Sequence, residues 1–297
     1  MPKYFVSSES SKFNLDSPYE LVRPHFFLGG EVNLHIPKDI SKQVCFVELD
    51  LQNRSLESLL ILKELSSRKN KRICAIVPYM PYSRQDRRDK PSDCLFSEHL
   101  ANIICDTGLT DVVVIETHDK QAAKYFESRN VQYHHVPVFS YLVAEVMATH
   151  GKDIVLVAPD KGSAAAVEDV ANTLSCQWTV MQKLRDDKGN VFRIEACSDV
   201  VHGARVLLID DMIDTAGTIA SAAELLYASG AVEVHVCAAH GLFSGQAIEK
   251  LRQANVSSVA VLNTTTSAAE TAVANKTLVD LVDVSPLIIK TLGELVV

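Results

Sequence analysis

The stretch Val206-Leu-Leu-Ile-Asp-Asp-Met-Ile-Asp-Thr-Ala-Gly-Thr-Ile219 decides the fold of this 297-residue chain. Its first four residues, 206–209, are apolar and predict a buried strand, and helix-forming residues follow at 220–226. Between strand and helix lie three carboxylates, two hydroxyls and a glycine: Asp210, Asp211, Asp214, Thr215, Thr218 and Gly217. A buried strand that runs directly into a helix is the repeating unit of a parallel α/β sheet.

The polar junction between that strand and helix predicts a site for a sugar phosphate. Residues 215–218 would lie at the helix N-terminus, where backbone N–H groups lack partners and the helix dipole is positive, which suits a phosphate. Asp210 and Asp211 cannot bind phosphate, but they suit ribose hydroxyls or a metal ion beside it. The alternative is an acidic turn before an ordinary capped helix. The ordered run Asp-Asp-x-x-Asp-Thr-x-Gly-Thr favours the sugar-phosphate site, which we call the cradle (residues 210–218).

The rest of the chain alternates strand-like and helix-like stretches in the same way. Strands are predicted over 44–49, 73–77, 111–115, 153–158, 178–181, 206–209, 232–238 and 259–262, and helices over 56–65, 97–104, 164–174, 219–228 and 244–254, with Ser244 as a helix N-cap. This alternation predicts an α/β fold with two related domains, each a mainly parallel sheet flanked by helices. We expect domains at 1–140 and 141–276, and a C-terminal tail at 277–297 that could pack back on the first domain.

Composition narrows the class of protein. The net charge of −8 predicts no general affinity for nucleic acid or for an anionic membrane. No apolar run reaches the roughly 18 residues of a membrane span, and the first residues lack the apolar core of a signal peptide. The seven cysteines are scattered without a Cys-x-x-Cys pair, which is typical of free thiols in a reducing compartment. We therefore expect a cytoplasmic protein.

Further polar segments follow other predicted strands. Residues 84–90 gather four cations, whose guanidinium groups match phosphate oxygens, although a solvated basic turn has the same composition. His118 follows the strand at 111–115, where a lone histidine is as often structural. Asp160 lies in a Pro-Asp-x-Gly turn after the strand at 153–158, and the polar segment 181–190 predicts a mobile loop or a charged hairpin tip.

Together these motifs resemble a known family. The cradle resembles the phosphoribosyl-diphosphate (PRPP) binding loop of the phosphoribosyltransferase superfamily. The other segments narrow the resemblance to the ribose-phosphate pyrophosphokinase family, over about residues 22–265. The resemblance implies an enzyme that transfers the β,γ-diphosphoryl group of MgATP to O1 of ribose 5-phosphate, giving PRPP and AMP. It also implies a Mg²⁺ cofactor and a homo-oligomer whose nucleotide site lies at a subunit interface.

The resemblance assigns roles residue by residue. It implies that Lys183 and Arg185 are catalytic and that His118 and Asp160 contact the metal. The ATP-binding residues would be Phe27, Glu31, Arg84, Gln85, Asp86 and His118. Ribose 5-phosphate would bind Asp210, Asp211, Asp214, Thr215, Ala216, Gly217 and Thr218. Three positions depart from the family pattern: Gly29 replaces an aspartate, Asp119 stands where an alanine is common, and Ser163 replaces a glycine.

Two alternatives have different consequences. A phosphoribosyltransferase that uses PRPP would share the cradle, but it would not need a second α/β half with Arg84-Gln85-Asp86. A non-catalytic regulatory or nucleotide-sensing relative would be expected to lose the loop cations, whereas Lys183 and Arg185 are both present. The chain has neither a Gly-x-x-x-x-Gly-Lys-Ser/Thr motif nor a Gly-x-Gly-x-x-Gly motif, which argues against a P-loop kinase and a Rossmann dehydrogenase.

Overall fold

The chain folds into two compact units, one of which is discontinuous in sequence. The structure, a computed structural model, describes residues 3–7, 11, 13, 19–38, 40, 44–68, 72–185, 191–195 and 198–295, without the side chains of Lys3 and of residues 182–198. The first unit contains Met1–Pro137 and Val284–Val297, and the second contains Val138–Asp283. Residues 279–282 form an edge strand of the second unit, and the helix that follows belongs to the first.

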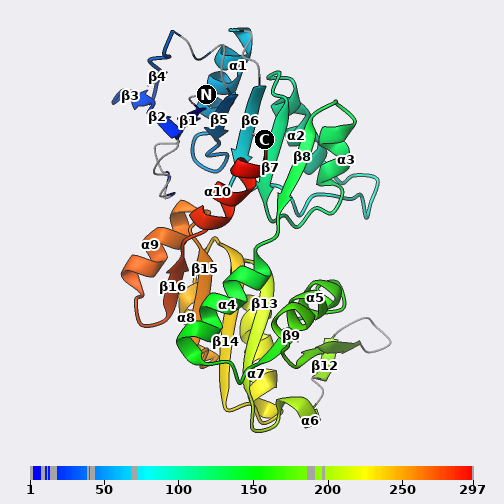
Figure 1. Ribbon diagram of the computed structural model, residues 1–297. Helices are drawn as coiled ribbons and strands as arrows, with labels where there is room; N and C mark the ends of the chain where they lie inside the picture. Colours follow the sequence, from blue (N-terminus) through cyan, green and yellow to red (C-terminus); the bar gives the residue numbers. More distant parts are fainter. Residues whose placement is uncertain are drawn as a thin grey trace. The chain divides into compact units, whose positions relative to one another are not determined.

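The first unit is built on a parallel sheet of six strands (Figure 1). Their spatial order is β2 (Tyr19–Val22), β1 (Lys3–Val6), β5 (Val44–Glu48), β6 (Arg72–Val77), β7 (Asp111–Ile115) and β8 (Gln132–Val136). The central strands read as continuous apolar runs because both faces of a parallel sheet are covered. Every residue of β7, for example, is buried.

The described residues of this unit form the helices α1 (Ser55–Ser67), α2 (Phe96–Cys105), α3 (Ala122–Glu127) and α10 (Ser285–Glu294). The apolar sides of α1, α2 and α3 join one core with alternate residues of the strands, including Val47, Ala75 and Val112. The C-terminal helix α10, red in Figure 1, contacts β8.

Arg72 connects that C-terminal segment to the sheet. The guanidinium of Arg72 on β6 donates to both carboxylate oxygens of Asp111 and to the carbonyl oxygen of Leu295. Asp111 is 2% exposed and also hydrogen-bonds His134 at 3.0 Å. A buried carboxylate needs such partners because removing it from water is costly.

The second unit repeats the architecture. Its parallel sheet has the order β10 (Trp178–Val180), β9 (Val155–Ala158), β13 (Arg205–Ile213), β14 (Glu233–Gly241), β15 (Ser258–Leu262) and β16 (Val279–Val282). Its helices are α4 (Phe139–His150), α5 (Ala164–Leu174), α6 (Ser198–Val201), α7 (Gly217–Ala228), α8 (Ala247–Gln253) and α9 (Thr266–Ala274). Helices α4 and α5 contact each other and the strands, while α7, α8 and α9 contribute to a separate core cluster.

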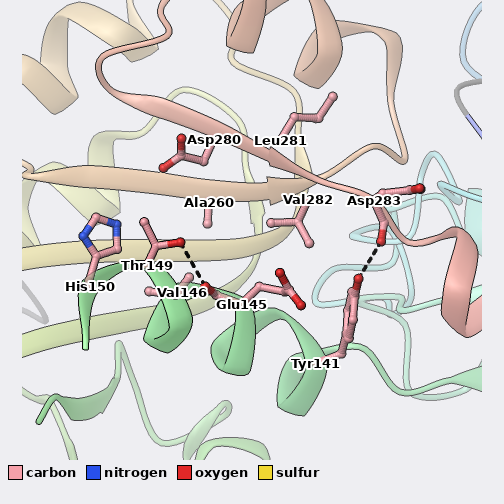
Figure 2. Close-up of a pocket in the computed structure, with 10 residues that line it drawn as sticks. All are labelled: Tyr141, Glu145, Val146, Thr149, His150, Ala260, Asp280, Leu281, Val282 and Asp283. Atoms are coloured by element: carbon pink, nitrogen blue, oxygen red, sulfur yellow. Dashed lines mark hydrogen bonds between the residues drawn. The ribbon is translucent and has the colours of Figure 1, made fainter. Parts of the chain in front are cut away.

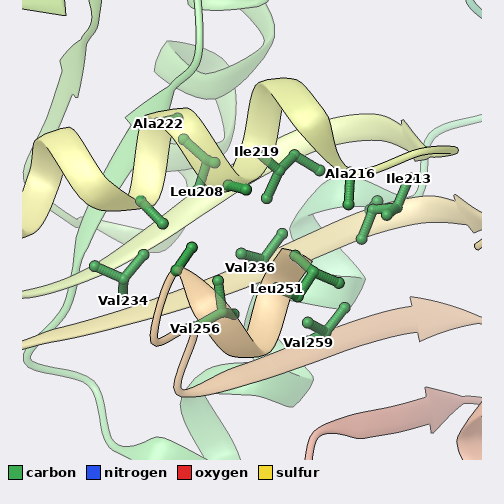
Figure 3. Packing of buried hydrophobic residues seen from close by; sticks show 14 of the residues in the cluster. Leu208, Ile213, Ala216, Ile219, Ala222, Val234, Val236, Leu251, Val256 and Val259 are labelled. Atoms are coloured by element: carbon green, nitrogen blue, oxygen red, sulfur yellow. The ribbon is translucent and has the colours of Figure 1, made fainter. Parts of the chain in front are cut away.

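That core cluster fixes the helix that follows the cradle. Figure 3 shows Ile219 and Ala222 of α7 directed toward the sheet, near Leu208 of β13. Val236 of β14 and Leu251 of α8 complete the packing, and all five side chains are buried. Burial of such side chains contributes about 1.5–3 kcal/mol each for the larger ones, so the position of α7 relative to β13 is set by apolar packing.

The two units share a strand order and one further feature. In each unit the strand that comes first in sequence (β1 or β9) is flanked on one side by the second strand (β2 or β10), which forms the edge of the sheet. The later strands follow one another on the other side of the first strand. In each unit an antiparallel hairpin follows that second strand: β3 (His25–Phe26) with β4 (Val32–Asn33), and β11 (Gln182–Arg185) with β12 (Val191–Glu195). The prediction of two related α/β domains is therefore confirmed.

Other sequence expectations can be compared with the described residues. No described helix combines the length and apolar character needed to cross a membrane. The six cysteines in the described part of the chain are free thiols, and Cys45, Cys74, Cys105 and Cys237 are buried. The two units divide between Pro137 and Val138, so residue 140, the expected end of the first domain, lies in the helix α4 of the second unit.

Candidate functional site

The cradle begins inside a strand. The expected strand ended at residue 209, but β13 runs to Ile213 because β14 extends beside it to Gly241. Asp210 therefore pairs with Ala238 in the ladder, and Met212 and Ile213 are buried between the two aspartates and the loop. The carboxylates of Asp210 and Asp211 are both half-buried.

The loop that links β13 to α7 accepts hydrogen bonds from residues that lie beyond α7 in sequence. The backbone N–H of Ser244 donates to the carbonyl of Asp214 at 2.9 Å, and the Lys250 ammonium donates to the carbonyl of Thr215 at 3.1 Å. Ala216 adopts a left-handed conformation with φ 58°, which non-glycine residues rarely adopt and which often marks a functional site. The prediction that Ser244 caps a helix is wrong, because α8 begins at Ala247 and the Ser244 amide is used by the loop.

The helix α7 begins at Gly217 with Ala216 as its N-cap, so residues 215–218 lie at the start of a 12-residue helix. The backbone amides of a helix's first turn have no intrahelical acceptor and carry partial positive charge. Thr215 and Thr218 are exposed. This end of α7 therefore offers donors to an anion from solvent.

Asp160 is close enough to the cradle to interact with it electrostatically. Burial raises the pKa of Asp210 to about 7, and the negative charges of Asp211 and Asp160 contribute. Asp160 follows β9, the strand next to β13, and its Oδ1 accepts from the backbone N–H groups of Gly162 at 2.8 Å and Ser163 at 3.2 Å. The Ser163 hydroxyl donates to the Asp160 carbonyl at 3.1 Å, so this serine closes the turn.

Lys183 and Arg185 lie on the hairpin of the second unit. In β11 Lys183 pairs with Ile194 of β12, and the register shifts between Leu184 and Arg185. β12 contacts α7, so the hairpin lies beside the helix that begins at the cradle. The side chains of Lys183 and Arg185 lie outside the described part of the structure, and their assigned roles stay predictions.

Phe27 and Glu31 lie on the hairpin of the first unit. Phe27 is 49% exposed, and its ring meets the His25 ring edge-on at 4.9 Å between centroids. The turn is closed by hydrogen bonds from Phe27 N–H to the Glu31 carbonyl and from Gly30 N–H to the Phe27 carbonyl. A Cβ at Gly29 would have no heavy atom within 4 Å, so the missing aspartate is not excluded by space.

Arg84, Gln85 and Asp86 follow β6 in an irregular segment. Arg84 and Gln85 are exposed and Asp86 is half-buried, and a hydrogen bond from Gln85 N–H to the carbonyl of Tyr82 turns the chain, with Tyr82 at φ 63°. Part of the predicted basic cluster is neutralised, because Arg87 pairs with Asp89 at 3.2 Å on the surface.

His118 is exposed after β7, and the structure brings it together with the Arg84–Asp86 segment. The connection runs through Ser97, a residue that the sequence did not single out. Its backbone N–H donates to the Gln85 carbonyl at 3.4 Å, and its hydroxyl donates to Asp119, the residue after His118. A serine at the start of a predicted helix was the only available signal. Lys250 was also not predicted. It contacts the carbonyl of Thr215, 35 positions away, and nothing in the sequence around Lys250 indicates that contact.

The predicted residues are thus divided between the two units. The first holds Phe27, Glu31, Arg84, Gln85, Asp86 and His118, and the second holds Asp160, the hairpin pair and the cradle. Within the described residues no three His, Cys, Asp or Glu side chains are arranged to hold a metal ion. A Mg²⁺ ion commonly binds one or two carboxylates together with substrate phosphates and water, so the oxygen donors of Asp160 and the cradle fit it in kind.

A separate pocket of about 310 Å³ lies in the second unit. Figure 2 shows it between α4, which contributes Tyr141, Glu145 and His150, and the strands β15 and β16. Tyr141 closes one end by donating to the carbonyl of Asp283 at 3.0 Å. None of the predicted site residues lines this pocket.

Comparison with known proteins identifies relatives over most of the chain. Residues 14–108 match the N-terminal domain of ribose phosphate pyrophosphokinase, and residues 193–295 match the phosphoribosyl synthetase-associated domain. The ribose-phosphate pyrophosphokinase of Sulfurisphaera tokodaii is 33% identical over 276 residues, which cover 91% of each chain. That of Aquifex aeolicus is 33% identical over 243 residues, covering 80% of this chain and 77% of the relative.

The fold has a solved counterpart. The crystal structure of phosphoribosylpyrophosphate synthetase from Mycobacterium smegmatis matches 99% of this chain and 98% of its own, with a TM-score of 0.78 and 24% identity. At that identity the match shows the fold. Since relatives above 30% identity align over more than two thirds of their own length, the chain belongs to the ribose-phosphate pyrophosphokinase family.

Proposed function

We propose that this enzyme transfers the β,γ-diphosphoryl group of ATP to ribose 5-phosphate. The O1 hydroxyl of the sugar attacks the β-phosphorus, and a new O1–P bond forms. The bond from that phosphorus to the α,β-bridging oxygen breaks, AMP leaves with the oxygen, and one proton is released. The observation that carries the proposal is the cradle, with two half-buried carboxylates in β13 directly before the start of α7.

The cradle would bind ribose 5-phosphate through complementary groups. The phosphate would accept from the first amides of α7 and from the hydroxyls of Thr215 and Thr218. The ring hydroxyls would donate to Asp210 and Asp211. Lys250 supports this arrangement, because its ammonium holds the loop carbonyl of Thr215 and adds positive charge beside the phosphate position.

The transferred group would be stabilised by cations. Lys183 and Arg185, on the hairpin whose strand β12 contacts α7, would neutralise the charge that develops on the diphosphoryl oxygens. Arg84, Gln85 and Asp86, with His118, would position ATP. Most of the rate enhancement would then come from orientation and fixed charge, because phosphoryl transfer requires little covalent participation by the protein.

Mg²⁺ would be the cofactor, held by His118 and Asp160 and by the phosphates of ATP. When bound, it would supply positive charge to those phosphates. Support comes from the raised pKa of Asp210, which shows that burial and the nearby Asp211 and Asp160 charges disfavour ionisation there. A cation near Asp160 would offset that repulsion.

We also propose a homo-oligomer in the cytoplasm. Phe27 is half exposed and the neighbouring Leu28 is fully exposed, although both are large apolar residues at a hairpin tip. Such residues are often covered by a partner, here a second copy whose nucleotide they would contact. The free thiols are typical of a reducing compartment.

One incubation tests the reaction. The protein is mixed with ribose 5-phosphate, MgATP and inorganic phosphate, and AMP and PRPP are measured. Equal amounts of AMP and PRPP are expected. ADP in place of AMP would show simple phosphoryl transfer and refute the proposed chemistry. Binding of both substrates without any product would favour the non-catalytic, nucleotide-sensing alternative.

A further inference from the structure

Asp119 is a buried carboxylate beside the predicted nucleotide-binding residues. Its side chain is 1% exposed, and it follows His118 directly in sequence. Carboxylates are rarely buried without hydrogen-bond donors. The described contacts of Asp119 therefore indicate what this residue does.

Both oxygens of Asp119 have donors. Oδ2 accepts from the hydroxyl of Ser97, and Oδ1 accepts from the backbone N–H of Gln121 at 2.7 Å. The Gln121 contact closes the turn that presents His118 at the end of β7. The Ser97 contact crosses to another element, because Ser97 is the second residue of α2.

Ser97 carries the connection to the Arg84–Asp86 segment. Its side chain is 0% exposed, and its backbone N–H donates to the carbonyl of Gln85 at 3.4 Å. Helix α2 also packs on α3, the helix that begins just after Gln121, as Figure 1 shows. Ser97 and Asp119 thus link two segments that lie more than 30 positions apart in sequence.

The burial of both side chains makes this link more than a surface contact. Ser97 is 0% exposed and Asp119 is 1% exposed, so water cannot replace the hydrogen bond between them. A buried carboxylate that lost the Ser97 donor would keep only the backbone N–H of Gln121 among these two donors, and leaving a buried acceptor unsatisfied is costly.

We propose that Ser97 and Asp119 form a positioning bridge that holds the Arg84–Asp86 segment and His118 in one arrangement for MgATP. Neither residue needs to touch the nucleotide. The role of the bridge rests on the proposed function, because that function makes both segments parts of one ATP site. Geometric displacement of binding groups by about 1 Å can cost as much as 10²-fold in rate, so a lost bridge should be measurable.

The test compares Ser97→Ala with Ser66→Ala. Ser66, on α1 of the same unit, donates its hydroxyl to the carbonyl of Thr107 and contacts neither predicted segment, so it controls for loss of a hydroxyl hydrogen bond. The dissociation constant for MgATP is measured by calorimetry, and KM for each substrate is measured alongside the melting temperature. Ser97→Ala should weaken MgATP binding and raise its KM by about fivefold or more, with KM for ribose 5-phosphate within about twofold of wild type. Ser66→Ala should leave all three constants unchanged.

A double-mutant cycle identifies the partner. If the bridge is real, Ser97→Ala has little further effect on MgATP binding in an Asp119→Ala background, because the two residues act through one contact. Independent, multiplicative effects would overturn the proposal, as would Ser97→Ala with wild-type affinity for MgATP. A wild-type protein that binds MgATP but forms no AMP would refute the proposed reaction alone. A wild-type protein that does not bind MgATP would refute both.

Discussion

The negative charge of Asp210 should favour binding of ribose 5-phosphate but lower the stability of the folded protein. Asp210→Asn removes one negative charge from the cradle while keeping the shape of the side chain. Its Oδ1 accepts from the backbone N–H of Asp211 at 2.9 Å, and the amide oxygen of asparagine can accept the same bond. The variant therefore tests the cost of the charge with little change in packing.

The size of the effect follows from the titration of Asp210. Burial, with the charges of Asp211 and Asp160, raises its pKa from the ordinary value of 3.8 to about 7. At 1.36 kcal/mol per pH unit, this interval corresponds to about 4 kcal/mol of lost stability once Asp210 is ionised in the folded protein. A raised carboxyl pKa favours the folded state below pH 4, and that contribution is lost as the pH rises toward 7.

Asp210→Asn should consequently be more stable than wild type at pH 8, by up to about 4 kcal/mol, and by less than half as much at pH 5. The free energy of unfolding is measured by urea titration at both pH values, without substrate or divalent cation. Asp169→Asn is the control, because Asp169 is an exposed carboxylate on α5, and it should change stability by less than about 0.5 kcal/mol.

The same variant should bind ribose 5-phosphate more weakly, since Asp210 would no longer be a charged acceptor for a ring hydroxyl. Loss of a charged hydrogen-bond acceptor corresponds to about tenfold in affinity. Equal stability of Asp210→Asn and wild type at pH 8, or a gain of equal size at pH 5, would refute the electrostatic reasoning. Unchanged affinity for ribose 5-phosphate would refute the assignment of Asp210 to the sugar.

Three further substitutions test other parts of the structure. Lys183→Ala should lower kcat by at least about 10²-fold in the AMP assay, the scale of one lost transition-state donor, and near-normal turnover would contradict its assigned role. Asp111→Ala should cost about 3–5 kcal/mol at pH 7 by urea titration, because the Arg72 guanidinium loses its buried partner. Burial alone would raise the pKa of Asp111, but its hydrogen bonds, first of all the one from Arg72, lower it. The difference in unfolding free energy between wild type and Asp111→Ala should therefore shrink as the pH falls below 4, and an equal difference at pH 3 would contradict this. Gly29→Asp should keep the wild-type melting temperature and lower KM for MgATP about fivefold by supplying an acceptor for the base; a lower melting temperature or an unchanged KM would count against this.

The regular elements were predictable because parallel strands buried on both faces leave a local signal. The run 111–115 matches β7 at both ends, and the run 73–77 matches β6 except that the strand begins one residue earlier, at Arg72. The extension of β13 through Asp210 and Asp211 left no such signal, because two carboxylates in a row are typical of a turn. Only pairing with β14 as far as Gly241 keeps those residues in the sheet.

The tail at 277–297 could be placed only in part from the sequence, because its two elements depend on distant segments. The strand β16 was assigned to the tail, although its partner β15 makes it an edge strand of the second unit. The helix α10 belongs to the first unit, where the Leu295 carbonyl accepts from Arg72, 223 positions away. Contacts of such separation are decided by the topology of the sheet.

The chemical groups of the cradle were recognisable from sequence, but the groups that hold them in place were not. An aspartate or threonine carries its chemistry in its identity, so a cluster of them after a strand predicts a ligand. Lys250 contacts the backbone carbonyl of Thr215, and one of the two contacts of Ser97 is with the carbonyl of Gln85. Any residue supplies a carbonyl, so no pattern marks these partners. The left-handed Ala216 is of the same kind, because its conformation depends on the loop to which it belongs. Supporting contacts of this type determine whether a predicted site has working geometry, and they become visible only in the folded chain.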